Sequence, residues 1–190
     1  IHANHFLPTN AALIPTGEIQ PVSGTPYDLR QPKALPAEIS LDTNFCLNGS
    51  GLREAARLET DELEMIVETD APGLQVYDAA RLDTSPVLGH SGNPYGGHAG
   101  IAMEPQVWPD APNQPNFPSI TLRPGERFSQ TSFFRFIRKQ PERLRDQSLT
   151  SGIFAKRRSV TSATRTGSPS FAEQIAAIVV CTSRFPSSPV

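Results

Sequence analysis

The stretch "LEMIVET", residues 63 to 69, decides the fold class of this chain. Apolar Leu63, Met65 and Val67 alternate there with a second set that contains Glu64 and Glu68. Residues two apart share one face of a β-strand, so one face of this stretch is apolar and the other is largely polar. The pattern predicts a half-buried strand.

The neighbouring stretches extend this strand into a sheet. "LREAARLE", residues 52 to 59, precedes it across a short polar link, which predicts a hairpin, with a short helix as the competing interpretation. "GLQVYDAA" (73 to 80) and "GIAMEPQV" (100 to 107) are further candidate strands. In "LRPGERFSQTSFFRF" (122 to 136), Pro124 and Gly125 suit the centre of a type II turn, and the aromatic run after them predicts a closing strand.

The composition agrees with an all-β chain. Nineteen prolines and thirteen glycines among 190 residues are too many for long helices, and they separate short runs rich in Val, Ile, Phe and Thr. No internal repeat of 20 to 50 residues is present. Several short strands with turns between them predict an antiparallel β-sandwich rather than a parallel sheet.

Charge divides the chain near residue 137. Residues 1 to 137 hold 8 Lys and Arg against 16 Asp and Glu, whereas residues 138 to 190 hold 9 against 3. The second part is rich in Ser and Thr and almost without apolar periodicity, so burial cannot offset its ordering entropy. We expect one β domain over 1–137 and a disordered basic tail over 138–190, with the apolar stretch 171–181 as its one candidate for order. The tail is either an ordinary variable extension, or the product of read-through in a wrong frame or of fusion to a foreign segment.

Several function classes lack support in this sequence. The nearly neutral charge gives no nucleic-acid signal and no polybasic membrane signal. The apolar run "IAAIVVC" (175 to 181) is far shorter than the about 20 residues of a spanning helix, and no leader opens the chain, so a cytoplasmic protein is the expectation. Cys46 and Cys181 match no metal or redox spacing, and we interpret them as free thiols rather than as a disulfide or a ligand pair.

The familiar catalytic motifs are also absent. The sequence contains no Gly-rich phosphate loop, no HExxH and no GxSxG, so nucleotide, zinc-protease and serine-hydrolase interpretations have no basis. What remains is a set of polar residues in or beside apolar strands: Asp42, Gln75, His98 and Glu104. Each has an ordinary alternative, namely an Asx turn for Asp42, a solvent-facing position for Gln75, a structural loop role for His98, and a salt bridge or an outward position for Glu104.

Longer blocks of the sequence resemble the aldose 1-epimerase, or galactose mutarotase, family. They are "LIPTGEIQPVSGTPYDLR" (13 to 30), "LDTNFCLN" (41 to 48), "LREAARLE", "PGLQVYDAA" (72 to 80) and "YGGHAGIAMEPQVWPDAPNQPNFPSITLRPGE" (95 to 126). They occur in the family's order over about residues 1 to 137. The resemblance implies the galactose mutarotase type of β-sandwich and interconversion of the α and β anomers of hexoses such as galactose and glucose.

The resemblance also assigns roles to the polar residues. Glu104 stands where the family has the general base that acts on the anomeric hydroxyl, and Asp42 and Gln75 match residues that bind sugar hydroxyls. His98 falls in the loop before the base and has a positioning role at most. Proton transfers are sufficient for this reaction, so the resemblance implies no metal and no other cofactor, and the expected partner is an aldohexose.

The chain departs from the family in two respects. Family members are about twice as long as the matching region, and the block of the type "H-x-Y-F-N" that carries their general-acid histidine has no counterpart here. The resemblance therefore covers the C-terminal half of the family's sandwich and leaves it incomplete. A carbohydrate-binding β-sandwich without catalysis, or an inactive fragment, is accordingly the rival interpretation.

Overall fold

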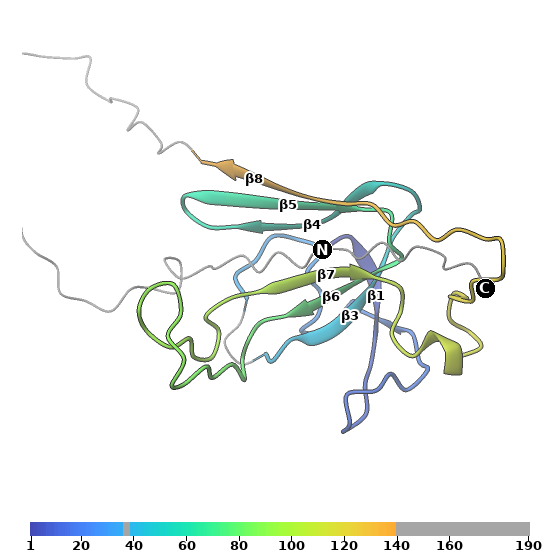
Figure 1. Cartoon of the computed structure of the whole chain (residues 1–190), viewed down its shortest axis with the longest axis horizontal. Helices are drawn as coiled ribbons and strands as arrows, with labels where there is room; N and C mark the ends of the chain where they lie inside the picture. Colours follow the sequence, from blue (N-terminus) through green and yellow to red (C-terminus); the bar gives the residue numbers. More distant parts are fainter. Residues whose placement is uncertain (36–38, 140–190) are drawn as a thin grey trace, which may run out of the picture.

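The structure is a computed structural model that describes residues 1–35 and 39–139. It contains eight strands and one short 3-10 helix in these ranges: β1 (Ala3–Leu7), β2 (Gln20–Pro21), β3 (Asp42–Leu47), β4 (Arg53–Glu59), β5 (Leu63–Thr69), β6 (Gly73–Tyr77), β7 (Ala102–Gln106), η1 (Ala111–Asn113) and β8 (Ser132–Arg138). The strands form two antiparallel sheets, in the orders β2-β1-β3-β6-β7 and β4-β5-β8. Figure 1 shows them as two layers, with β8, β5 and β4 above β7, β6, β3 and β1.

The predicted strands are confirmed. Residues 52–59 contain β4, which pairs with β5 in an antiparallel hairpin, so the helical alternative is wrong. The candidate strands at 73–80 and 100–107 contain β6 and β7. The Pro124–Gly125 turn is also present, since Gly125 has φ +86° and the Glu126 N–H donates to the Arg123 carbonyl over 3.0 Å. The suggested order within residues 171–181 and the expected disorder of 138–190 lie outside the described residues, except for Arg138 and Lys139.

Strand β5 is more buried than its sequence indicates. It is the central strand of its sheet, between β4 and β8, and Ile66 on its outer face is buried. The register places Ile66 between Arg57 of β4 and Arg135 of β8. The long aliphatic parts of two such flanking side chains can cover an apolar neighbour, which explains why the outer face of β5 tolerates an isoleucine.

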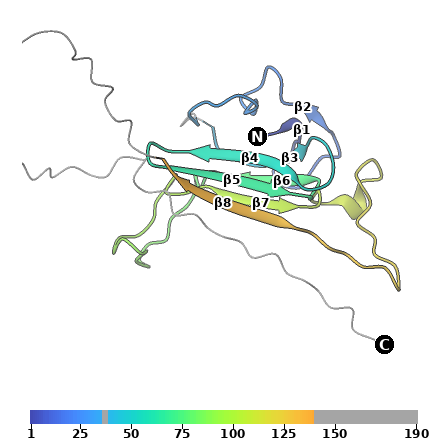
Figure 2. The same ribbon diagram turned by 90° about the horizontal axis from the view of Figure 1, so that it is seen from above.

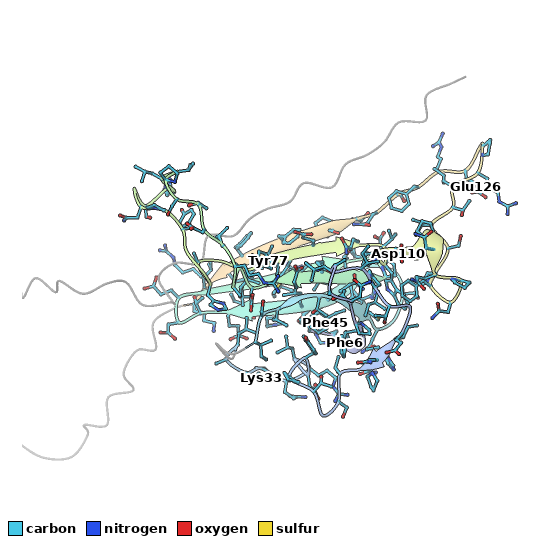
Figure 3. The ribbon with its side chains drawn as sticks, turned by 90° about the horizontal axis from the view of Figure 1, so that it is seen from below. Phe6, Lys33, Phe45, Tyr77, Asp110 and Glu126 are labelled. Atoms are coloured by element: carbon cyan, nitrogen blue, oxygen red, sulfur yellow. The ribbon has the colours of Figure 1, made fainter. Side chains whose placement is uncertain are left out.

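The core lies between the two sheets. Phe45 of β3 and Leu74 of β6 face Val67 of β5 and Ala56 of β4 in one cluster, and all four are nearly inaccessible to solvent. Figure 3 places Phe6 beside Phe45, in line with their pairing in the β1–β3 ladder. The alternation of the strands then directs every second side chain of β3, β6 and β7 to the opposite, outer face of the five-stranded sheet.

Strand β8 lies at the edge of the smaller sheet, and its aromatic residues are only partly covered. Phe134 packs against the core, whereas Phe133 and Phe136 are exposed. Two long segments leave the larger sheet at opposite ends, the loop 78–101 before β7 and the segment 107–118 with η1 after it (Figures 1 and 2). Within the described ranges, no helix is long and apolar enough to cross a membrane.

Candidate active site

Three neighbouring strands align three polar side chains on the outer face of the larger sheet. In the β3–β6 ladder Asn44 is opposite Gln75, and in the β6–β7 ladder Gln75 is opposite Glu104. Directly opposed residues in an antiparallel sheet have Cβ atoms roughly 5 Å apart, so the three side chains form one row across the strands.

A second row runs parallel to the first. Asp42 is opposite Tyr77, and Tyr77 is opposite Ala102. The two rows are joined diagonally, because the Gln75 Nε2 donates a hydrogen bond of 2.8 Å to the Asp42 Oδ1. Asp42, Gln75 and Glu104, which the sequence places 33 and 29 residues apart, are thereby brought together.

The two rows form the floor of a cavity of about 340 Å³. This volume is at the lower end of the range for small-molecule sites and suits a ligand of the size of a monosaccharide. Its lining residues are Leu7, Thr9, Leu13, Pro15, Asp42, Asn44, Gln75, Tyr77, Glu104, Gln106 and Pro109. The floor is therefore polar, and the side walls come from two loops and the end of β1.

The first wall is the loop after β1. Thr9 and Pro15 pair as an isolated β-bridge, and the Asn10 Oδ1 accepts hydrogen bonds from the backbone N–H groups of Ala12 and Ile14. These contacts close residues 9 to 15 into a compact turn. Leu13 at its tip has φ 61°, a conformation that is uncommon for a residue with a Cβ atom, and it lines the cavity.

The second wall is the segment that contains η1. Trp108 lies on the outer face of the sheet, where its ring contacts Phe117 edge to face at 5.2 Å and its Nε1 donates to the Pro72 carbonyl over 3.0 Å. Both aromatic rings cover Cys46, and burial raises the pKa of its thiol to about 12. Trp108 can lie this close because β6 begins with a glycine, since a Cβ atom on Gly73 would be 3.0 Å from the Trp108 Cδ1.

The two walls are tied to each other. The Gln114 Nε2 donates to the Pro15 carbonyl over 3.4 Å, and the Asn116 Nδ2 donates to the Gly17 carbonyl over 2.8 Å. Each bond joins residues 99 positions apart in the sequence. The cavity is consequently fixed on both sides by hydrogen bonds between loops.

Glu104 is the chemically distinctive group of the floor. Its side chain is half-buried, and among the described residues its carboxylate takes part in no hydrogen bond and no salt bridge. Asp42, by contrast, already accepts a bond from Gln75. A carboxylate without a protein partner in a cavity keeps its lone pairs available for a ligand proton.

His98 lies away from this cavity. It belongs to the loop 78–101, with φ 59°, and its backbone N–H donates to the Ala79 carbonyl over 2.9 Å. Its Nδ1 is 3.8 Å from the Oδ2 of Asp78, a buried carboxylate that also accepts the N–H groups of Leu41 and Ala80. This arrangement connects the loop to the residue before Asp42.

Sequence reasoning missed three residues of the floor: Asn44, Tyr77 and Gln106. Each is two positions from a residue that it did find, so the period of two in a strand was the signal that could have identified them. Asn44 is buried, and its Oδ1 accepts from the Gln106 Nε2 at 3.4 Å, while its Nδ2 has no hydrogen-bond partner among the described residues.

Known proteins that resemble this chain identify its family. Residues 1–135 match the model of the family described as aldose 1-epimerase. The chain belongs to the aldose 1-epimerase family. It is 41% identical over 145 residues to galactose mutarotase from Homo sapiens and 33% identical over 153 residues to aldose 1-epimerase from Escherichia coli K12. The resemblance inferred from the sequence is confirmed, and the family is one of isomerases.

The match covers 72% of this chain but only 42% and 44% of those two relatives. Structural superposition covers a similar share of the two chains. A GalM/aldose epimerase homologue from C. elegans superposes with a TM-score of 0.66 at 28% identity, over 74% of this chain and 45% of that one. The chain thus spans less than half the length of the epimerase relatives it matches, and it has their all-β antiparallel fold.

Proposed function

We propose that this chain binds an aldohexose in the cavity on the outer face of the five-stranded sheet and promotes interconversion of its anomers. The observation that carries the proposal is the convergence of Asp42, Gln75 and Glu104 from three strands in one cavity. The family membership of residues 1–135 supports the reaction type. The names of the relatives, galactose mutarotase and aldose 1-epimerase, support a sugar such as galactose as the substrate.

Glu104 is the general base in this proposal. Opening of a hexose ring requires removal of the proton from the anomeric hydroxyl at C1, while the bond between C1 and the ring oxygen breaks. A positioned carboxylate typically contributes about 10² to 10⁴-fold to such a proton transfer. Glu104 is suited to it because its carboxylate is in the cavity and has no described protein partner.

Asp42 and Gln75 bind the sugar hydroxyls. The Asp42 carboxylate has lone pairs beyond the one used by Gln75, so it can accept from neighbouring hydroxyls. The Gln75 amide group points its Nε2 at Asp42, which leaves its carbonyl oxygen as an acceptor. His98 acts at a distance, by holding the loop that leads into β7.

The test is polarimetry of freshly dissolved α-D-galactose with the full 190-residue chain and with Glu104→Gln. We expect the chain to accelerate the approach to anomeric equilibrium over buffer and the variant to lose about 10² to 10⁴-fold of that acceleration. Glutamine keeps the shape of the side chain and removes the base, so binding of galactose should persist.

The matched control is Glu126→Gln. Glu126 lies in the exposed turn at the tip of the 118–131 segment, away from the sheet, as Figure 3 shows. Its substitution should leave the rate unchanged. Binding of galactose without any acceleration by the unmodified chain would contradict the catalytic proposal and would support the carbohydrate-binding alternative.

A further inference from the structure

Asp78 is a buried carboxylate directly after β6 that the proposed reaction does not use. The residue is only 5% exposed, and burial of a charged group is costly unless hydrogen bonds compensate it. Its Oδ2 accepts the Leu41 N–H over 2.9 Å, and its Oδ1 accepts the Ala80 N–H over 3.0 Å. The two oxygens therefore connect the segment before β3 with the start of the loop 78–101.

The bond to Leu41 extends the β3–β6 ladder by one pair. The last pair of that ladder joins Asp42 to Tyr77, and beyond it the Asp78 N–H donates to the Leu41 carbonyl over 3.1 Å. In a regular antiparallel ladder the Leu41 N–H would donate in return to the Asp78 carbonyl. Here the chain turns away, since Ala79 has φ 56°, and the Asp78 carboxylate accepts this bond in place of the carbonyl.

This end of the ladder carries the aspartate that we propose to bind the sugar. Asp42 is the first residue of β3, and Leu41 directly precedes it. Strand ends open more readily than strand centres, so the backbone at Asp42 depends on the bonds of its neighbour. Gln75 holds the Asp42 carboxylate, whereas Asp78 holds the backbone beside it. Figure 3 shows Tyr77, the residue before Asp78, at the end of the sheet nearer the loop 78–101.

The two ends of the loop 78–101 meet at Asp78. The His98 N–H donates to the Ala79 carbonyl over 2.9 Å, and both residues have left-handed backbone conformations, with φ 59° and 56°. Residues with a Cβ atom keep such conformations only where the surrounding structure enforces them. The packing is close, since a Cβ atom on Gly97 would be 2.8 Å from the Ala80 carbonyl oxygen, and the His98 Nδ1 is 3.8 Å from the Asp78 Oδ2. Asp78 is thus held in place from the loop side.

Glu104 is fixed in a different way. It is the third of the five residues of β7, and it pairs with Gln75 at the centre of the β6–β7 ladder. The ladder itself, which continues on both sides of this pair, holds its backbone. A disturbance at Asp78 should therefore move Asp42 and leave Glu104 in position.

We propose that Asp78 is a positioning residue, which sets the place of Asp42 in the cavity through its bond to the Leu41 N–H and thereby the affinity for the sugar. This inference rests on the proposed binding of an aldohexose. Asp78 is not among the residues that line the cavity, so it acts through Leu41 and Asp42 and not by contact with the ligand. Its loss weakens binding of the sugar and leaves proton transfer by Glu104 intact.

The test compares the full 190-residue chain with Asp78→Asn, using calorimetry for the binding of galactose and polarimetry for the rate. Asparagine has a similar size but only one acceptor oxygen, so its amide group faces one of the two N–H groups. We expect the dissociation constant to rise about tenfold, the typical effect of misplacing one hydrogen bond to a charged group. The rate at saturating galactose should stay almost unchanged, because only binding is lost.

Asp83→Asn is the matched control. Asp83 is exposed in the same loop, and its Oδ1 accepts the Ser85 N–H over 2.9 Å, the same local turn that Asp78 forms with Ala80. It has no bond to the segment before β3 among the described residues. Its substitution should leave both the affinity and the rate unchanged.

A double-mutant cycle separates positioning from general damage to the structure. If Asp78 acts through Asp42, the Asp78→Asn substitution should have almost no effect on the affinity once Asp42→Asn is present. Effects that arise at independent places would instead add. The cycle thus gives a readout that a purely structural role would not produce.

A second variant, Asp78→Ser, tests the bond to Leu41 alone. A serine hydroxyl can accept from the N–H two residues further on, as Asp78 does at Ala80, but it is too short to replace the carboxylate at Leu41. We expect faster hydrogen exchange of the Leu41 amide and a loss of affinity similar to that of Asp78→Asn. This variant provides the answer if Asp78→Asn does not fold.

The outcomes distinguish this inference from the proposed function. A folded Asp78 variant overturns the role of Asp78 and leaves the proposed function intact if it binds galactose as tightly as the unmodified chain, or if it loses as much rate as affinity. A loss of affinity that persists in the Asp42→Asn background has the same meaning. An unmodified chain that does not bind galactose overturns both.

Discussion

The two sheets share one core but hold their acidic side chains in different ways. On the outer face of the β4-β5-β8 sheet, four glutamates are paired with cations, and they are Glu54, Glu59, Glu64 and Glu68. On the outer face of the five-stranded sheet, Asp42 and Glu104 line a cavity to which no described cation contributes. On the first face the carboxylates form ion pairs within the protein. On the second face they have no described cationic partner and are available to a ligand.

The comparison teaches that, in the described part of the chain, the inner faces of the sheets form the core and one outer face holds acidic groups without a charged partner. Paired surface charges need no further partner and can be removed at little cost. Unpaired polar groups in a cavity are retained against a desolvation cost, which is a physical reason to look for function there. Substitutions at the core, at the cavity wall and on the charged face should therefore have decreasing effects.

The largest effect is expected from Phe45→Ala, which removes a side chain that both sheets share. Phe45 is almost fully buried in the cluster that joins β3 to β4 and β5. Replacing a buried phenylalanine by alanine typically costs about 3–5 kcal/mol of unfolding free energy, because a cavity remains. Urea denaturation measures this change.

Phe133→Ala is the control for that measurement. Phe133 is on β8 and is 52% exposed, so its removal should leave the urea midpoint close to that of the unmodified chain. Equal losses in the two variants would contradict the assignment of the core to the space between the sheets.

An intermediate effect is expected from Gly73→Ala, next to the lining residues Asn44 and Gln106. A Cβ atom there would be 2.7 Å from the Asn44 Oδ1 and 3.1 Å from the backbone oxygen of Gln106, so Asn44 or Trp108 must move. Overpacking of this kind typically costs about 1–3 kcal/mol. Trp108 is the sole tryptophan, so its fluorescence should report the displacement, and galactose binding should weaken.

Gly96→Ala is the matched control, because nothing lies within 4 Å of the added atom. If Gly73→Ala leaves both the fluorescence and the binding unchanged, the contact between Trp108 and the sheet does not shape the cavity.

The smallest effect is expected from Arg57→Ala on the charged face. A hydrogen bond from Arg57 lowers the pKa of Glu54 from its ordinary value of 4.5, and the variant should raise this pKa again. A carboxyl with a lowered pKa stabilises the fold above its ordinary pKa, and this contribution is lost as the pH falls through the lowered value. The unmodified chain should therefore be slightly the more stable at pH 7. The electrostatic part of the difference should vanish in acid, which leaves only the small cost of uncovering Ile66.

NMR titration of Glu54 and urea midpoints at the two pH values measure this change. A midpoint shift as large as that of Phe45→Ala would show that the charged face is not the dispensable one. A Glu54 pKa unchanged by the substitution would show that the pair with Arg57 does not form in solution.

The sequence predicted the strands better than it predicted their partners. Alternation at 63–69 and the Pro124–Gly125 turn are local signals, and both are present in the structure. Strand β1 and the pairing of β3 with β6 depend on contacts between distant residues, for which one sequence contains no direct signal. The roles proposed for Asp42, Gln75 and Glu104 likewise came from the family resemblance, because each residue taken alone had an ordinary alternative.

The walls of the cavity were beyond prediction for the same reason. The hydrogen bonds of Gln114 and Asn116 to the loop after β1 each join residues 99 positions apart. Loop sequences lack the regular alternation of strands, so nothing in the sequence indicates the partner of a side-chain amide there. Asn44 and Tyr77, however, were within reach. Once Asp42 and Gln75 were chosen, the residues two positions further along each strand had to lie on the same face.

Asn44, Gln75 and Glu104 are aligned across three hydrogen-bonded strands, so the sheet fixes the spacing of the polar side chains on its outer face. Positions on such a surface are available only in steps of about 4.8 Å from strand to strand and about 6.7 Å along one face of a strand. A change in the distance between two functional groups therefore cannot be made gradually by moving the backbone. It has to be made by exchanging one side chain for a longer or shorter one, as between aspartate and glutamate, so adaptation of this cavity to a ligand of another shape should proceed in discrete substitutions.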